Sequence, residues 1–279
     1  MDIGVCIFPT DKAIRMDELA RELESRRFES LFVPEHTHIP TSRKSPFAGG
    51  KPLPEEYKRT FDPFVCLMAA GAATKTLKLG TGICLIIERD TITTAKSVAS
   101  LDAMTSGRFL FGIGGGWNRE EMEHHGTDFT SRFKRLEEQV KAMKELWTKD
   151  EAEFHGTYVN FDKSWSWPKP ITKPHPPVLL GGESKYTMNR VVDFCDGWFP
   201  RGRDAAGLLT AWKELKEIAA RKGRDMKTIS VSIFAAPPDQ AKLDDFRTAG
   251  ATRSLLLLPP EGRDVVLPLL DQWAKFISK

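Results

Sequence analysis

Eight times along the sequence, a short apolar run is followed by a longer amphipathic one. The short runs are rich in β-branched and aromatic residues, as strands are, and the longer runs repeat apolar residues with the period of a helix. The predicted strands cover residues 3–8, 30–34, 77–86, 108–114, 177–181, 196–200, 229–234 and 253–258. The predicted helices cover residues 16–27, 62–74, 91–104, 132–147, 184–194, 205–221, 240–249 and 263–277.

Strands this apolar predict a parallel sheet covered on both faces, because a strand with one wet face would alternate polar and apolar residues. Eight strand–helix units in 279 residues favour an α/β fold of the (β/α)8 TIM barrel type over an open doubly wound sheet, which stays as the alternative. We expect residues 1–279 to form a single domain. Two connections are too long for simple turns: a loop after strand 2, about 35–61, and an insertion between strands 4 and 5, about 150–176.

Charge and cysteine content exclude several other classes of protein. The net charge is only +3, without the basic stripe that nucleic-acid binders carry. No apolar run reaches the length of a membrane span, and the first residues show no signal-peptide pattern. The cysteines Cys6, Cys66, Cys84 and Cys195 are widely spaced, which is typical of buried thiols in a reducing compartment. We therefore expect a cytoplasmic protein that binds neither membranes nor nucleic acid.

Candidate site residues follow the second predicted strand, which runs directly into Glu35, His36 and His38. Active sites of (β/α)8 barrels lie at the carboxyl ends of the strands. Two histidines with this spacing could ligate a metal, fix the loop, or act on a bound ligand. The strand ends offer too few further metal ligands, so we expect no metal and favour a histidine that faces a ligand.

Glycines mark three other strand ends. The run GGGWN (114–118) fits a close backbone approach to a ligand, or a helix start capped by its asparagine. It follows the fourth strand and not the first, so it is not the dinucleotide-binding fingerprint. The glycines of LGTGICLI (79–86) indicate either a bulge inside a strand or a close approach of the backbone to another group. The run GGES (181–184) leads into a helix, where free amides suit a phosphate or form a plain turn.

Four motifs together carry a resemblance to a known family: VPEHTHIP, LGTGICLI, GRFLFGIGGGWNREEMEHHG, and PPVLLGGESK followed by DFCDGWFP. In this order they resemble the luciferase-like flavin and deazaflavin barrels, and most of all the branch that uses the 5-deazaflavin coenzyme F-420. The resemblance covers about residues 3–199. It implies a (β/α)8 barrel with the insertion after strand 4, and a homodimer formed through the early helices.

The resemblance also implies roles by position. His36 would face the reactive edge of the coenzyme ring, with Glu35 beside it setting its pKa. Gly82 and Ile83 would form a bulge behind the ring, where the family often has a non-prolyl cis peptide. The residues implied to bind the cofactor are Glu35, His36, Gly82, Ile83, Gly114, Gly115, Gly116, Trp117, Asn118, Gly181, Gly182, Glu183 and Ser184.

One departure from the family bears on the substrate. Members that oxidise sugar phosphates have an acid in the loop after strand 4, where this chain has Trp117. The change disfavours glucose 6-phosphate and favours a flatter, more apolar substrate, which Trp117 and Trp198 could stack. Further candidates for substrate contact are His38, Arg201 and Arg203.

The predicted function is hydride transfer between coenzyme F-420 and an unidentified small organic substrate, with His36 and Glu35 as catalytic residues. The alternatives are an FMN-dependent two-component monooxygenase of the same fold, a barrel that binds a coenzyme or ligand without catalysis, and a metal-dependent hydrolase. The anionic tail of coenzyme F-420 would also need a basic surface nearby. Candidates for that surface are Arg43, Lys44, Lys51, Lys58, Arg59, Arg201 and Arg203.

Overall fold

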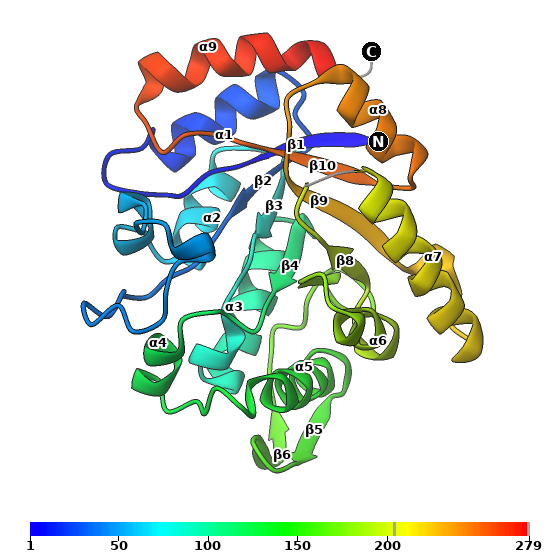
Figure 1. Cartoon of the computed structure of the whole chain (residues 1–279). Helices are drawn as coiled ribbons and strands as arrows, with labels where there is room; N and C mark the ends of the chain where they lie inside the picture. The colour runs from blue at the N-terminus through cyan, green and yellow to red at the C-terminus, as the bar shows by residue number, and fades with distance from the viewer. Residues whose placement is uncertain (203–204, 278–279) are drawn as a thin grey trace.

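The computed structural model describes residues 1–202 and 205–277, and in these residues eight parallel strands close into a barrel (Figure 1). The strands are β1 (Asp2–Cys6), β2 (Ser30–Val33), β3 (Lys78–Thr81), β4 (Phe109–Ile113), β7 (Val178–Gly181), β8 (Gly197–Phe199), β9 (Ser230–Ala236) and β10 (Arg253–Leu257). Each strand pairs with the barrel strand that follows it, and β10 pairs with β1 to close the ring. The predicted (β/α)8 barrel is confirmed.

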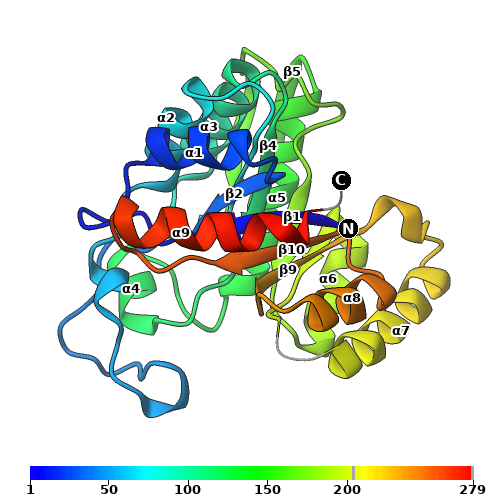
Figure 2. The ribbon, with the colours of Figure 1, turned by 90° about the horizontal axis from the view of Figure 1, so that it is seen from above.

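Helices surround the barrel (Figures 1 and 2). They are α1 (Met16–Ser25), α2 (Pro63–Ala72), α3 (Thr91–Met104), α4 (Arg119–His124), α5 (Arg132–Thr148), α6 (Lys185–Phe194), α7 (Ala205–Arg221), α8 (Gln240–Thr248) and α9 (Arg263–Trp273). Short 3-10 helices are η1 (Ala48–Gly50), η2 (Glu55–Lys58), η3 (Ile86–Glu88), η4 (Met226–Thr228) and η5 (Ala274–Phe276). Helices α1 and α9 lie side by side, so the first and last units of the barrel meet, and Arg26 pairs with Asp271 between them at 2.7 Å.

Side chains at the helix starts fix where each helix begins after the strand before it. Asp62 accepts hydrogen bonds from two backbone N–H groups of α2, and Pro63 takes the first helical position, where its missing N–H costs nothing. Asp90, Ser184 and Asp239 cap α3, α6 and α8 in the same way. The cap at Ser184 matters most here, because it places the N-terminus of α6 directly at the end of β7.

The barrel interior is filled by one buried cluster, while a larger core lies between the strands and the helices. The interior cluster is Cys6, Phe32, Leu110, Leu179, Phe199 and Leu255. Gly80 makes room for the ring of Phe32, since a Cβ at this position would lie 2.3 Å from a ring carbon. The four cysteines are buried free thiols, as predicted. Because the interior is packed, the space for a ligand lies beyond the carboxyl ends of the strands.

Two predicted boundaries were wrong, and one element was missed. The third strand ends at Thr81 and not at residue 86, because the chain turns through a cis peptide between Gly82 and Ile83. The last helix ends at Trp273 and continues only as a 3-10 turn. The insertion after α5 forms an antiparallel hairpin, β5 (Glu151–His155) and β6 (Asn160–Trp165), which Figure 1 shows beside α5. Among the described residues, no helix has both the length and the apolar character to cross a membrane.

Candidate functional site

A cavity of about 500 Å³ opens at the carboxyl ends of the barrel strands. Twelve of the thirteen residues implied to bind a cofactor lie in its walls, and the exception is Asn118. The segments that follow β2, β3, β4, β7 and β8 all contribute, so the motifs that are far apart in the sequence meet at one place.

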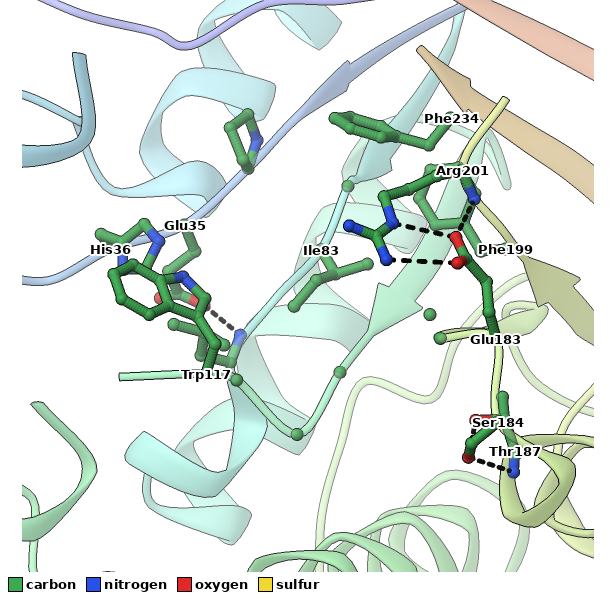
Figure 3. Close-up of a pocket in the computed structure, with 18 of the residues that line it drawn as sticks. Glu35, His36, Ile83, Trp117, Glu183, Ser184, Thr187, Phe199, Arg201 and Phe234 are labelled. Atoms are coloured by element: carbon green, nitrogen blue, oxygen red, sulfur yellow. Dashed lines mark hydrogen bonds and ion pairs between the residues drawn. The ribbon is translucent and has the colours of Figure 1, made fainter. Parts of the chain in front are cut away.

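Figure 3 shows how the cavity is laid out. His36 and Trp117 lie at one end, Ser184 and Thr187 lie at the other, and Ile83 lies between them. The peptide between Gly82 and Ile83 is cis, as the family resemblance implied. The cavity wall is apolar at Ile83, and its polar groups are those of the two ends and the ion pair of Arg201 with Glu183.

His36 is held by a carboxylate that the sequence analysis did not include in the site. Its Nδ1 lies 2.8 Å from Oε2 of Glu121, and both side chains are buried. Glu121 belongs to α4, which starts directly after the glycine run that follows β4. In a neutral His36 the Nδ1–H donates to Glu121, so that Nε2 is left as a proton acceptor.

Glu35 has a different partner from the one predicted. It accepts a hydrogen bond from the backbone N–H of Leu85 at 2.7 Å and another from Nε of Arg89 at 2.6 Å. Although burial opposes the charged form of Arg89, the carboxylate of Glu35 raises the pKa of this guanidinium. The prediction that Glu35 sets the pKa of His36 is corrected: Arg89 neutralises Glu35, which holds the chain beyond the cis peptide, and Glu121 contacts the imidazole.

A further buried carboxyl group, that of Glu88, interacts with the carboxylates of Glu121 and Glu35. Glu88 is only 7% exposed. Burial, together with the negative charges of Glu121 and Glu35, raises the pKa of Glu88 to about 9. Glu88 therefore keeps its proton at neutral pH and can donate it to Glu121. Glu121 thus contacts His36 and also acts on the protonated Glu88.

Aromatic rings enclose the His36 end of the cavity. The ring centroid of Tyr57 lies 5.2 Å from that of His36, and the centroid of Trp117 lies 6.0 Å from it. Phe47 contacts both Tyr57 and Trp117, with centroid distances of 5.1 Å and 5.9 Å. We call His36, Phe47, Tyr57 and Trp117 the aromatic cage. Phe47 and Tyr57 come from the long loop after β2, and the sequence analysis did not find them.

Trp198 does not line the cavity, contrary to prediction. Successive side chains on a strand point to opposite faces, and in β8 it is Phe199 that points into the barrel. Trp198 packs in the outer core, where its Nε1 donates a hydrogen bond to the carbonyl oxygen of Gly182 at 2.7 Å. Its place in the cavity is taken by Phe199 and Phe234 (Figure 3).

The opposite end of the cavity is the N-terminus of α6. Gly182 has a φ of +125°, a conformation that side chains other than glycine rarely adopt. The turn brings Ser184 and Thr187 to the cavity wall, and the Ser184 side chain caps the helix by accepting from the N–H of Thr187. Nearby, Glu183 forms an ion pair with Arg201 at 2.9 Å. Free amides at such a helix start favour an anionic group.

Two other candidates lie elsewhere, and a third is not among the described residues. Asn118 is buried at the start of α4, but its side chain neither caps that helix nor lines the cavity. His38 lies outside the cavity walls, with its Nε2 2.8 Å from Nδ1 of His124. Arg203 falls outside the described residues. In the part of the chain that the structure describes, no three His, Cys, Asp or Glu side chains are grouped to hold a metal ion.

Four of the basic residues predicted to attract an anionic tail have local partners. Lys58 and Arg59 form ion pairs with Glu55, both at 2.8 Å. Arg43 stacks on Trp117, with its guanidinium carbon 5.7 Å from the ring centroid. Arg201 is paired with Glu183, as described above. Lys58, Arg59 and Arg201 have their charges paired locally and are therefore poor candidates for a surface that attracts an anionic tail.

The chain is similar to known proteins both in sequence and in fold. The family model described as luciferase-like monooxygenase matches residues 2–246. The uncharacterized protein Rv0953c of Mycobacterium tuberculosis is 39% identical over 279 residues, with 98% of each chain covered. The FMNH(2)-dependent dimethylsulfone monooxygenase of Pseudomonas putida is 30% identical over 148 residues, 52% of this chain and 40% of that protein. A solved F420-dependent secondary alcohol dehydrogenase, in complex with an F420–acetone adduct, has a TM-score of 0.79 at 18% identity, covering 99% of this chain and 98% of that one.

Proposed function

Since the chain belongs to the luciferase-like monooxygenase family, we propose that it transfers a hydride between the deazaflavin coenzyme F-420 and a small organic substrate. One observation carries the proposal: a single cavity has a carboxylate-held histidine at one end, a helix N-terminus at the other, and an apolar wall between them. A flat ring with an anionic side chain has this distribution of polarity.

The cavity fits such a cofactor. Its volume of about 500 Å³ falls within the usual range for cofactor sites. Gly114 and Gly181 keep its middle open around Ile83, because a Cβ on either would lie 2.7 Å and 3.3 Å, respectively, from side-chain carbons of Ile83. Ile83 would then support the face of the ring, and the amides near Ser184 would hold its phosphate.

The residues of the chain supply the proton chemistry. When bound, the deazaflavin donates or accepts the hydride. Glu121 fixes the tautomer of His36, so Nε2 takes the hydroxyl proton of an alcohol as its carbon is oxidised, or returns a proton to a carbonyl oxygen in the reverse direction. The aromatic cage excludes water from this exchange and favours a flat, apolar substrate. We therefore propose small alcohols and ketones as the substrate class.

The FMN-dependent alternative is supported by the sequence similarity to the dimethylsulfone monooxygenase. That alignment covers 52% of this chain. The F420-dependent alcohol dehydrogenase superposes over 99% of it, and at 18% identity this shows a shared fold and not a shared coenzyme. Titration of the purified chain with each coenzyme, followed by fluorescence, separates the two hypotheses. We expect coenzyme F-420 to bind about tenfold or more tightly than FMN, a free-energy difference of about 1.4 kcal/mol. Tighter binding of FMN would favour the two-component monooxygenase. Failure to bind either coenzyme would contradict both hypotheses.

We further propose that the chain forms a homodimer through α2 and α3. Large apolar side chains are exposed on these two helices, with Val65 70% and Met104 68% accessible. They border a surface groove lined by Phe64, Val65, Met68, Ala69, Ala72, Ser97, Ser100, Leu101 and Met104. An apolar patch of this kind on a water-facing surface is typical of a protein interface, and a second copy of the same two helices would bury it.

Val65→Glu is expected to weaken this dimer about tenfold or more, because it places a charge in an apolar contact. Light scattering coupled to gel filtration over a range of concentrations measures the change. Val265→Glu, at an exposed valine of α9, is the matched control and should leave the dimer intact. A wild-type chain that is monomeric throughout, or a Val65→Glu dimer as stable as the wild type, would refute the interface.

A further inference from the structure

Three arginines and two phenylalanines alternate in a row next to the cavity. The guanidinium carbon of Arg119 lies 4.8 Å from the ring centroid of Phe129, and that of Arg132 lies 3.7 Å from the same ring. Arg132 also stacks on Phe133 at 4.5 Å, and Arg190 stacks on Phe133 at 4.2 Å. We call these five residues the arginine ladder. It joins the starts of α4 and α5 to the second turn of α6.

Stacking on aromatic rings does not neutralise the positive charges of the three arginines. Within residues 1–202 and 205–277, none of the three arginines forms an ion pair, and Nε of Arg132 is buried without a hydrogen-bond partner. Burial, and then the like charges of Arg190 and Arg119, lower the pKa of Arg132. Arg132 is also the first residue of α5, whose first turn holds no acid, so its charge opposes the helix dipole.

The nearest carboxylates already have other partners. Asp128, whose charge acts on Arg119, accepts hydrogen bonds from the backbone and side chain of Thr130 at 2.6 Å. Glu137, whose charge acts on Arg190, pairs with Lys141 at 2.6 Å. The three arginine charges of the ladder are therefore not balanced by these carboxylates.

The ladder begins at the cavity wall. Phe133 lines the cavity and packs against the glycine run, since a Cβ on Gly115 would lie 2.6 Å from a carbon of its ring. Arg190 lies on α6, the helix whose start carries Ser184 and Thr187. Helices α5 and α6 pack against each other, as Figure 1 shows. At the other end of the ladder, Arg119 is exposed. The row thus leads from the cavity wall at Phe133 to solvent at Arg119.

We propose that Arg119, Arg132 and Arg190 bind the carboxylates of an acidic tail that extends from the cofactor beyond its phosphate. A guanidinium that stacks on a ring through its face can still donate N–H groups from its edge to carboxylates. In Arg132, Nη1 already donates to the carbonyl oxygen of Phe129 at 2.6 Å, which leaves Nη2 for this role. The inference rests on the proposed function, in which coenzyme F-420 has a glutamyl tail. FMN ends at its phosphate and would leave the ladder unused.

The test compares two forms of the coenzyme, one with its glutamyl tail and one without glutamyl residues, in fluorescence titrations at low salt. Arg190→Gln is expected to weaken binding of the tailed form about tenfold, and Arg119→Gln, at an exposed site, about threefold. Both variants should bind the untailed form as the wild type does. Lys134→Gln removes one charge from an exposed position of α5 outside the ladder and serves as the control, which should change neither affinity. Added salt should weaken only the tailed form in the wild type.

The outcomes separate the two proposals. If both coenzyme forms bind and the arginine variants weaken them equally, or weaken neither, the tail site is wrong while the proposed function stands. If the wild type binds neither form, the proposed function fails and the tail site with it. Selective loss of the tailed form in Arg190→Gln and Arg119→Gln, with Lys134→Gln unchanged, supports the site.

Discussion

Replacing His36 by alanine is expected to lower turnover about 100-fold or more, because a positioned acid–base group contributes about 10²–10⁴-fold to a rate. The variant removes the Nε2 atom that we propose exchanges the substrate proton, while the apolar wall and the helix N-terminus remain in place. The dissociation constant for coenzyme F-420 should therefore stay close to that of the wild type. The measurement is steady-state turnover with the most active member of an alcohol and ketone panel, together with a coenzyme titration.

His38→Ala is the matched control for this experiment. His38 lies two residues away but outside the cavity walls, where it contacts His124. Its replacement should leave turnover within about twofold, as is usual for surface substitutions. Equal losses in the two variants would contradict the assigned proton exchange at His36, and so would a His36→Ala enzyme as active as the wild type.

Glu88→Gln is expected to stabilise the protein by about 3 kcal/mol at pH 7, since each pH unit between two pKa values corresponds to 1.36 kcal/mol. Burial and the neighbouring carboxylates raise the pKa of Glu88 to about 9, from 4.5. The folded state must therefore take up a proton at any pH between these values. The resulting loss of stability is absent below pH 4.5, grows as the pH rises, and is complete above pH 9. Glutamine is neutral at every pH, so the variant removes this dependence.

Urea unfolding of the wild type and Glu88→Gln at pH 5, 7 and 8.5 measures this linkage. The difference in the free energy of unfolding should be small at pH 5 and increase at each step. Glu55→Gln is a suitable control, because Glu55 lies on the surface, where its ion pairs are exposed to solvent. A stability difference that does not change with pH would show that Glu88 is not protonated in the native state.

The sequence predicted the barrel well because the signal is repeated. Each strand is apolar on both faces and each helix has a 3.6-residue pattern, so an error in one unit does not change the fold. The same patterns could not locate the end of β3, since residues after Thr81 stay apolar while the backbone turns through the cis peptide. The hairpin formed by β5 and β6 was missed because its strands are short, polar and exposed.

The parts of the site that are formed by backbone could be predicted from the sequence. The parts that depend on where a side chain points were harder to predict. Runs of glycine at Gly114 and Gly181 can be read directly, because few other arrangements need them. Glu121 could not be chosen over Glu120, since two acids in the first turn of a helix are expected for electrostatic reasons alone. Only the fold shows that Glu121 is fully buried against His36. Likewise, Trp198 and Phe199 are neighbours on β8 but point to opposite faces, and the sequence alone did not show which of the two faces the barrel.

The aromatic cage joins two parts of the chain that evolve under different constraints. Trp117 is anchored at the tip of a barrel strand, whereas Phe47 and Tyr57 arrive on a long excursion that contributes nothing to the sheet. Because loops tolerate change better than the elements they connect, this loop can be exchanged or lengthened while the barrel beneath it stays the same. New chemical preferences can therefore arise in relatives of this enzyme through edits to one surface segment.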